Sequence, residues 1–312
     1  MLDYILIIAG LLLILGGANY LTDGAAALAK RFNVSEFVIG LTIVALGTSA
    51  PEGVVSILSA LNPEAGGDMS IGNVVGSNIF NTYVVLGLCA LFTPIVLTKR
   101  NMKIDIPMGI LVSTILLIVC LGGKIYSIYG IVMLLIYAAL ILFSVKSSKG
   151  DLQADEEHEE IKSMPLWLAA VLTVGGLAAL IYGGDIFLDG AVNVAERYNI
   201  PNNIIAITLL AGGTSLPELA ASVVSLIKGK SDIALGNVIG SNIANILLVL
   251  GASATITPLE MGTIEIKDLL YVLGGSVIIY IAGYTFGKSR ISKVEGAVML
   301  AIYSFYMWQL LA

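Results

Sequence analysis

The segments GTSAPEGVVS at residues 47–56 and GNVVGSNIFN at residues 72–81 occur twice in this chain, the second time as GTSLPELAAS at 213–222 and GNVIGSNIAN at 236–245. We call the GTS segment the first motif and the GN segment the second motif of each half. Further identical residues upstream of both copies keep the same spacing. A register maintained over such a length indicates two related halves that arose by duplication.

Composition places the chain in a membrane. Hydrophobic residues make up 57% of the sequence and charged residues 12%, which is about half the share typical of soluble domains. Apolar stretches long enough to cross a bilayer follow one another with short polar breaks. The net charge is −6, but much of the acid is clustered in one loop, so the charge does not indicate binding to nucleic acid.

The apolar stretches predict ten membrane-spanning helices, five in each half. We expect them at residues 3–29, 35–61, 70–93, 104–122, 125–145, 165–195, 201–227, 232–256, 266–286 and 291–311. Because each half has an odd number of spans, the second half must enter the membrane from the opposite face. The predicted fold class is therefore an all-α membrane protein with ten transmembrane helices in two inverted five-helix repeats. The expected domains are a first transmembrane repeat at 1–145, a charged cytoplasmic linker at 146–164 and a second repeat at 165–312.

Basic residues in the loops predict the orientation. Thirteen of the sixteen lysines and arginines fall in loops on one side of the membrane, and the other side has only Lys124, Arg197 and Lys267. Cytoplasmic loops carry an excess of Lys and Arg, so the thirteen are expected to be cytoplasmic and both termini extracytoplasmic. We expect an integral protein of the plasma (cytoplasmic) membrane.

Each first motif contains a glutamate deep inside an expected span, Glu52 in the first half and Glu218 in the second. An ionised carboxylate at membrane depth is costly, and it is therefore a functional candidate by default. Pro51 and Pro217 stand directly before these glutamates, and neither proline has an N–H to donate to the carbonyl one turn earlier. The sequence predicts a broken helix with free carbonyl oxygens at both places, where a cation or water can use them.

Other oxygen-bearing side chains flank the two glutamates. The first motifs supply the hydroxyls of Thr48-Ser49 and Thr214-Ser215. Each second motif supplies a serine and an asparagine spaced i, i+4, which share one helical face. These four are Ser77, Asn81, Ser241 and Asn245. No thiolate or imidazole accompanies them, and oxygen-only ligand sets select hard cations, with Ca²⁺ the best match and Na⁺ served by the same donors.

The two motifs, written GTSxPE and GNxxGSNIxN, resemble the α-repeats of the cation/calcium exchanger superfamily, sodium/calcium exchanger branch of prokaryotic type. The resemblance covers essentially the whole chain. It implies cation sites at the midplane between the two repeats, with first and sixth helices that slide to switch access. The implied ligands are the carboxylates of Glu52 and Glu218, hydroxyl or carbonyl oxygens of Thr48, Ser49, Ser77, Thr214, Ser215 and Ser241, the backbone carbonyls of Ala45 and Ala211, and the amides of Asn81 and Asn245.

Some positions beside the expected ligands depart from the family's pattern, namely Gly53, Thr82, Tyr83 and Gly212. Two interpretations of Tyr83 are open: it fills the space left by Gly53, or it tunes the preference among ions. Both central amides are asparagine here, whereas some relatives have an aspartate at one of them. The site then carries two formal negative charges, which argues against an additional bound potassium and against proton coupling at that position.

These features predict a secondary active antiporter that exchanges Ca²⁺ for Na⁺ by alternating access. Two buried glutamates cannot both stay ionised in an empty site of low dielectric, so the carrier is expected to switch only when loaded with cations. The resemblance implies Na⁺ entering and Ca²⁺ leaving, with more than two Na⁺ per Ca²⁺. Ca²⁺ and Na⁺ are the transported substrates, and no cofactor is expected. The bilayer is the other expected partner, with no obligatory protein partner and no nucleic acid.

Three alternatives stay open at this point. Within the same superfamily, the chain could be an exchanger of Ca²⁺ for H⁺ or another monovalent cation, although such relatives usually show Asn and no Pro in the first motif. A cation channel would also have inward carboxylates and carbonyls, but inverted repeats with broken helices favour a carrier. A membrane enzyme would need a nucleophile with an oriented base or a metal. The only histidine, His158, falls in the linker, so we expect no enzyme and no catalytic residue.

Overall fold

The structure, a computed structural model, describes residues 2–61, 66–148, 164–198, 211–284 and 289–311. Its contacts divide the chain into two compact units. The first unit comprises Met1–Pro51 and Ser144–Asn237, and the second comprises Glu52–Phe143 and Val238–Ala312. Each unit therefore combines segments from both halves of the sequence.

Within the described residues, six helical runs are long and apolar enough to cross a membrane. They are Leu2–Phe32, Met69–Phe92, Asn101–Cys120, Ser127–Ser148, Leu166–Arg197 and Ser231–Ile256. Each of them lies within a few residues of a predicted span. The helices Glu36–Thr48 and Ala50–Leu61 make a seventh if the two are counted as one span. The chain is an integral membrane protein built from helices, whose backbone polar groups are satisfied within each span.

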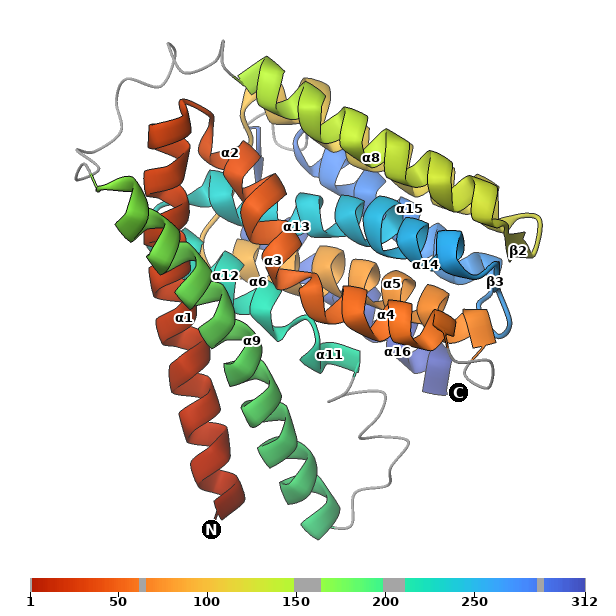
Figure 1. Ribbon diagram of the computed structural model, residues 1–312, viewed down its shortest axis with the longest axis horizontal. Helices are drawn as coiled ribbons and strands as arrows, with labels where there is room; N and C mark the ends of the chain where they lie inside the picture. Colours follow the sequence, from red (N-terminus) through yellow and green to blue (C-terminus); the bar gives the residue numbers. More distant parts are fainter. Residues whose placement is uncertain (1, 62–65, 149–163, 199–210, 285–288, 312) are drawn as a thin grey trace. The chain divides into compact units, whose positions relative to one another are not determined.

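The first unit is built around two long helices, α1 (Leu2–Phe32) and α9 (Leu166–Arg197). They lie side by side, red and green in Figure 1. The shorter elements of this unit are α2 (Glu36–Ile39), the π-helix η1 (Gly40–Val44), α3 (Ala45–Thr48), α11 (Ala211–Gly213), α12 (Leu216–Ile227) and the first part of α13 (Ser231–Ala244).

Glycines form the contact between α1 and α9. A Cβ atom at Gly17 would lie 2.7 Å from the carbonyl oxygen of Gly176, and one at Gly183 would lie 3.0 Å from the carbonyl oxygen of Gly10. Gly10, Gly17 and Gly24 follow one another at heptad spacing, so they share one face of α1. The two helices therefore touch backbone to backbone along a glycine seam, as small residues allow in membranes.

Small apolar side chains complete the core of the first unit around this seam. Ala18, Leu21 and Ala25 of α1 are buried, and they belong to one cluster with Val38 of α2 and Ala221 of α12. This cluster packs α12, which carries Glu218, against α1 and α9. The core thus positions the predicted site residues of this unit.

The second unit contains the other helices. They are α4 (Ala50–Leu61) from Glu52 onward, α5 (Gly66–Phe80), η2 (Asn81–Val85), α6 (Leu86–Phe92), η3 (Asn101–Asp105), α7 (Ile106–Cys120), α8 (Ser127–Ser148) up to Phe143, the end of α13, η6 (Asn245–Leu250), α14 (Gly251–Ile256), α15 (Ile266–Ala282) and α16 (Lys293–Leu311).

Two small antiparallel ladders join the sequence halves within the second unit. The strand β1 (Ile95–Val96) pairs with β4 (Arg290–Ile291), and β2 (Lys124–Ile125) pairs with β3 (Leu259–Glu260). β1 and β3 follow the helix of the second motif in their halves, whereas β2 and β4 precede the last helix. Each half therefore supplies one strand to each ladder in a reciprocal arrangement.

Glycine contacts in the second unit repeat this reciprocal pattern. A Cβ atom at Gly296 of α16 would lie 2.7 Å from the carbonyl oxygen of Gly87 in α6. A Cβ atom at Gly130 of α8 would lie 2.5 Å from the carbonyl oxygen of Gly251 in α14. In each half, the helix that follows the second motif, α6 or α14, thus contacts the last helix of the other half.

The secondary structure differs in detail from the prediction. The two-residue strands were not predicted, because an element this short shows no alternation of apolar and polar residues. The fifth expected span, 125–145, corresponds to α8, which runs from Ser127 through Ser148. The linker residues 149–163 and the first part of the expected helix, 201–210, lie outside the described residues.

We expect the substitutions Gly17→Ala and Gly176→Ala to destabilise the protein. A Cβ atom at Gly176 would lie 2.6 Å from the backbone nitrogen of Leu21, so the two helices must separate. Overpacking of this kind costs about 1–3 kcal/mol. The measurement is the Tm of the purified protein in detergent.

The neighbouring glycines provide matched controls. A Cβ atom at Gly16 or Gly175 would meet no described atom within 4 Å. Because alanine is the better helix former, Gly16→Ala and Gly175→Ala are expected to keep or raise the Tm. Equal melting of all four variants would contradict the glycine seam.

Candidate functional site

Both first motifs interrupt a helix directly before the glutamate. Ser49 separates α3 from α4, with φ −80° and ψ 6°. In the second half, Thr214 and Ser215 form the turn that separates α11 from α12. These breaks confirm the broken helices that were predicted from the prolines.

The backbone carbonyls beside the first break are partly used. The N–H of Ser49 donates to the carbonyl oxygen of Ala45 at 3.0 Å. The expectation that Pro51 leaves the Gly47 carbonyl without its helical donor stays a prediction. A carbonyl oxygen has two lone pairs, so Ala45 retains the capacity to bind a cation.

In the first unit, predicted ligands from both halves meet at Glu218. The side chain of Glu218 is fully buried, and its Oε1 accepts a hydrogen bond from the Ser49 hydroxyl at 3.1 Å. Ser49 and Ser215 are buried, and Thr214 is half-buried. The structure thus brings together a hydroxyl and a carboxylate that lie far apart in the sequence.

Asn237 is the centre of a hydrogen-bond network in the same unit. Its Nδ2 donates to the backbone carbonyl of Glu218 at 3.3 Å and to the hydroxyl of Ser222 at 3.0 Å. Its Oδ1 accepts a hydrogen bond from the Thr48 hydroxyl at 3.1 Å. Asn237 and Ser222 are fully buried. The network fixes a predicted ligand, Thr48, and the backbone of Glu218 to one side chain.

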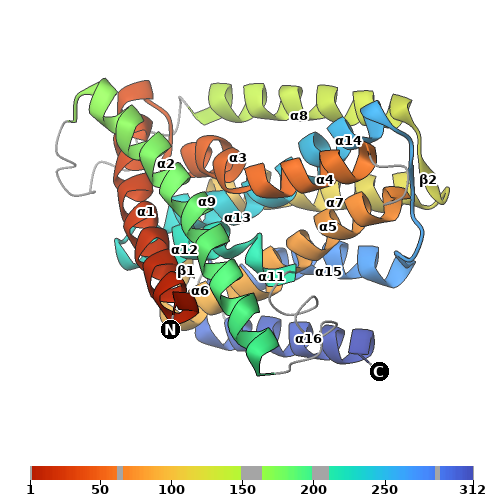
Figure 2. The same cartoon turned by 60° about the horizontal axis from the view of Figure 1, so that its bottom comes forward.

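The second unit contains the equivalent arrangement around Glu52. Asn73 Nδ2 donates to the backbone carbonyl of Glu52 at 3.1 Å and to the hydroxyl of Ser56 at 2.9 Å. These bonds join α4 to α5, which lie next to each other in Figure 2. Glu52 and Ser56 are fully buried. Both glutamates therefore have an asparagine from the following helix bound to their own backbone.

The second motifs place their predicted ligands on buried helix. Ser77, Asn81, Ser241 and Asn245 are all buried. The π-helix η2 begins at Asn81, and η6 begins at Asn245. Turns of π-helix are rare and are frequently found at functional sites. The two halves thus change their helix type at the same predicted ligand.

The amide of Asn81 has unused hydrogen-bonding capacity. Among the described residues, neither its nitrogen nor its oxygen has a hydrogen-bond partner, although the side chain is fully buried. Asn245 differs, because its Nδ2 donates to Asn78 Oδ1 at 3.2 Å while its oxygen has no such partner in the described part of the chain. A buried polar group without a partner is costly, so both oxygens are suited to a ligand.

Sequence reasoning missed the two asparagines that bind the glutamate backbones and the two serines that accept from them, Asn73, Asn237, Ser56 and Ser222. A signal for them was present in the spacing. Asn73, Ser77 and Asn81 follow one another at intervals of four, and so do Glu52 and Ser56. Helical periodicity places each set on one face, but the prediction used it only for the serine and the second asparagine.

The structure answers the question raised by Tyr83. A Cβ atom at Gly53 would lie 3.6 Å from Val249 Cγ2, with no atom of Tyr83 within 4 Å. The interpretation that Tyr83 fills the space left by Gly53 is therefore wrong. The glycine that makes room for it is Gly275, where a Cβ atom would lie 3.2 Å from Tyr83 Cε2. The Tyr83 hydroxyl donates to the backbone carbonyl of Tyr271 at 2.9 Å.

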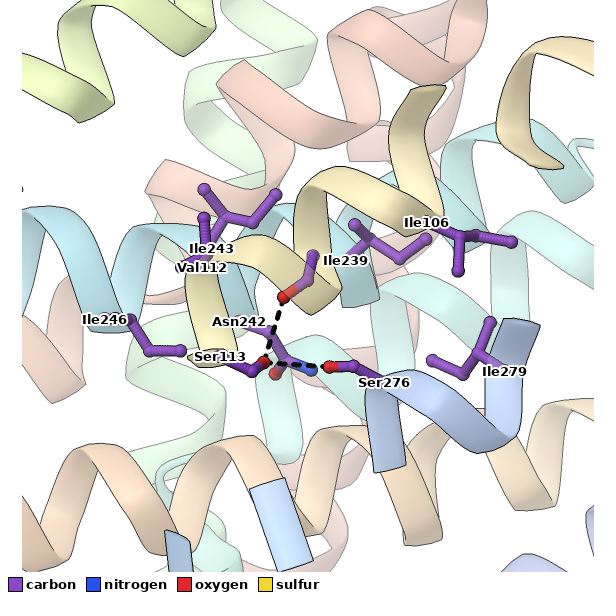
Figure 3. A pocket seen from close by; sticks show the side chains of 10 residues that line it. Ile106, Val112, Ser113, Ile239, Asn242, Ile243, Ile246, Ser276 and Ile279 are labelled. Carbon is purple, nitrogen blue, oxygen red and sulfur yellow. Dashed lines mark hydrogen bonds between the residues drawn. The ribbon is translucent and has the colours of Figure 1, made fainter. Parts of the chain in front are cut away.

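A separate cavity lies in the second unit among α7, α13 and α15 (Figure 3). Its empty volume is about 310 Å³, and isoleucines form much of its wall. The hydroxyls of Ser113 and Ser276 lie 2.9 Å apart on its polar side. Asn242 also lines it and donates to the Thr82 hydroxyl at 2.7 Å. Its lining contains none of the predicted ligands, so this cavity is not the predicted cation site.

The oxygen donors near each glutamate suit hard cations. Each unit offers one buried carboxylate together with hydroxyl, amide and backbone carbonyl oxygens. In the described ranges, no group of three or more His, Cys, Asp or Glu side chains lies together. This donor set fits Ca²⁺ and Na⁺ and does not fit metals that prefer thiolate or imidazole.

Comparison with known sequences gives the family. The family described as "Sodium/calcium exchanger protein" matches residues 2–146 and, separately, residues 168–312. The chain is 35% identical over 316 residues to the putative antiporter CaxA of Alkalimonas amylolytica, with 98% of each chain covered. It is 30% identical over 344 residues to the sodium/calcium exchanger MaX1 of Methanosarcina acetivorans, with 98% of this chain and 97% of that protein covered.

Comparison with solved structures gives the same answer. A structure of the sodium-calcium exchanger NCX_Mj matches with a TM-score of 0.85 and 31% sequence identity, covering 99% of both chains. The apolar spans, the buried carboxylates and the double match of the family profile agree with this likeness. The chain is therefore a transmembrane cation antiporter and belongs to the sodium/calcium exchanger family of the cation/calcium exchanger superfamily.

Proposed function

We propose that this antiporter exchanges Ca²⁺ for Na⁺, with Glu52 and Glu218 as its charged ligands. The observation that carries the proposal is the hydrogen bond from the Ser49 hydroxyl to the buried carboxylate of Glu218. A hydroxyl orients a carboxylate but leaves its negative charge in place. A cation supplies the compensating charge, and it uses both the carboxylate and the hydroxyl oxygen as ligands.

The proposed ligand set adds neutral oxygens to the two carboxylates. It consists of oxygens from Thr48, Ser49, Ser77, Thr214, Ser215 and Ser241, the backbone carbonyls of Ala45 and Ala211, and the amides of Asn81 and Asn245. The fully buried amide of Asn81 supports this set, because its oxygen makes no hydrogen bond to any described residue.

The charge of the site explains why transport is coupled. One Ca²⁺ cancels the charge of two carboxylates, whereas Na⁺ ions occupy the same oxygens in turn. An empty site with two ionised carboxylates is unfavourable at low dielectric. The carrier therefore changes its orientation only when loaded, so that one cation moves outward when the other has moved inward.

We propose ten spans in two inverted repeats, with both termini outside the plasma membrane. The reciprocal contacts of the second unit support this topology. An inverted repeat puts the loop after the third span of one half on the same membrane face as the loop before the last span of the other half. The ladders β1–β4 and β2–β3 each join such a pair of loops. The excess of Lys and Arg in alternate loops supports the orientation.

The helices α1 and α9 are the proposed sliding pair that switches access. The glycine seam between them supports this role, because few side chains stand between the two backbones and would have to be displaced when the helices move.

We expect Glu52→Gln and Glu218→Gln to reduce Ca²⁺ transport by about a hundredfold or more. The amide keeps the volume of the carboxylate, but it removes the charge that offsets the dehydration of Ca²⁺. The measurement is uptake of radioactive Ca²⁺ into proteoliposomes that contain the purified protein.

Glu260→Gln is the matched control for these variants. Glu260 is a solvent-exposed residue that pairs with Lys124 at 3.0 Å, so its neutralisation is expected to leave transport unchanged. Near-normal Ca²⁺ uptake in both Glu52→Gln and Glu218→Gln, in folded protein, would refute the ligand assignment.

The counter-ion is tested by imposing one gradient at a time. An outward Na⁺ gradient is expected to drive Ca²⁺ uptake into the vesicles, and a pH gradient of the same size is expected to drive little. The reason is that the central residues Asn81 and Asn245 are amides, which do not titrate. Uptake that follows the pH gradient and ignores Na⁺ would identify a Ca²⁺/H⁺ exchanger instead.

A further inference from the structure

The asparagine at the second position of each second motif makes the same two bonds in both units. Asn73 donates to the Glu52 carbonyl and the Ser56 hydroxyl, and Asn237 donates to the Glu218 carbonyl and the Ser222 hydroxyl. The donor–acceptor distances lie between 2.9 Å and 3.3 Å. We call each set an asparagine clamp. Both N–H groups of each amide are therefore committed to the helix that carries the glutamate.

The clamp acts at the place where the glutamate helix is weakest. α4 and α12 begin directly after a break, so their first turns have no preceding helical turn to stabilise them. The glutamate lies in this first turn in both helices. A second hydrogen bond to the glutamate's own carbonyl fixes that turn, and it thereby limits where the carboxylate can point.

We propose that Asn73 and Asn237 are positioning residues for the transported cation. Each one holds the backbone of a glutamate ligand and couples it to the helix of the second motif. Asn73, Ser77 and Asn81 lie on one face of that helix. By binding the glutamate backbone, Asn73 therefore fixes the position of Glu52 with respect to the predicted ligands Ser77 and Asn81. This inference rests on the proposed function, because it assumes that the glutamates bind the cation.

Asn237 has an additional effect on Thr48. Its Oδ1 accepts the proton of the Thr48 hydroxyl at 3.1 Å. Asn237 thereby holds the Thr48 hydroxyl, a predicted ligand, with the same side chain that binds the backbone of Glu218.

The test uses leucine variants of the full-length protein. Asn73→Leu and Asn237→Leu keep the branching of asparagine but remove both donors. Calorimetric titration with Ca²⁺ in detergent is expected to give a Kd about 10- to 100-fold higher than in the unmodified protein, as for other residues that orient metal ligands. Ca²⁺ transport is expected to show a raised KM, with kcat less affected.

A control separates positioning from simple stability. Asn101 is also a buried asparagine of the second unit, and its amide binds Thr98 and Asp105. Asn101→Leu is expected to lower the Tm while leaving the Kd for Ca²⁺ unchanged. If Asn73→Leu and Asn237→Leu also lower only the Tm and keep the Kd within about twofold, the asparagines hold helices together and the proposal is overturned.

Serine variants decide the matter if the leucine variants do not fold. Ser56→Ala and Ser222→Ala remove one acceptor from each clamp and are expected to raise the Kd about fivefold. Ser59→Ala is their control, because among the described residues the Ser59 hydroxyl binds only the Val55 carbonyl of its own helix. Serine variants that bind Ca²⁺ as tightly as Ser59→Ala would overturn the proposal.

The same titrations distinguish failure of the clamp from failure of the proposed function. If the unmodified protein binds Ca²⁺ and Glu52→Gln and Glu218→Gln lose that binding, the proposed function stands and the asparagine variants test the clamp alone. A protein that binds neither Ca²⁺ nor Na⁺ would overturn both.

Discussion

The burial of two carboxylates inside a membrane protein is the constraint on which the rest of this structure depends. Glu52 and Glu218 are both fully buried, and a charged group there is costly unless other groups compensate it. The sequence around them is accordingly rich in oxygen donors. The helix breaks at Ser49 and at Thr214-Ser215 place hydroxyl groups directly before the first turns of the helices that carry the glutamates. Unusual local backbone and unusual side-chain chemistry thus have one common cause.

Two different kinds of helix contact support this arrangement. Asn73 and Asn237 join neighbouring helices by directed hydrogen bonds, which fix one geometry. The glycine seam between α1 and α9 is not directed, since it depends only on the close approach of two smooth backbones. A carrier needs both kinds of contact, because its ligands must keep their geometry while its access to the two sides of the membrane changes.

The two halves are alike where they handle the glutamates and differ elsewhere. The asparagine clamps occur in both halves, as do the π-helices that begin at Asn81 and Asn245. Thr82 has no counterpart, because the second half has an isoleucine at the equivalent position. The Thr82 hydroxyl accepts a hydrogen bond from Asn242, which lines the cavity. This difference between the halves lies in the second unit, and it leaves the number of buried carboxylates unchanged.

The sequence by itself determined the membrane class, the duplication, the long spans and the two glutamates. The length of an apolar stretch, a repeated motif and the cost of a buried carboxylate can all be read from short stretches of sequence. The broken helices could be predicted from Pro51 and Pro217 because the effect of a proline on a helix is also local. Only the tertiary structure decided that Ser49 meets Glu218, that β1 pairs with β4, and that Gly275 accommodates Tyr83. These contacts join residues far apart in the chain, and their distances follow from how whole helices pack, which no short pattern of residues encodes.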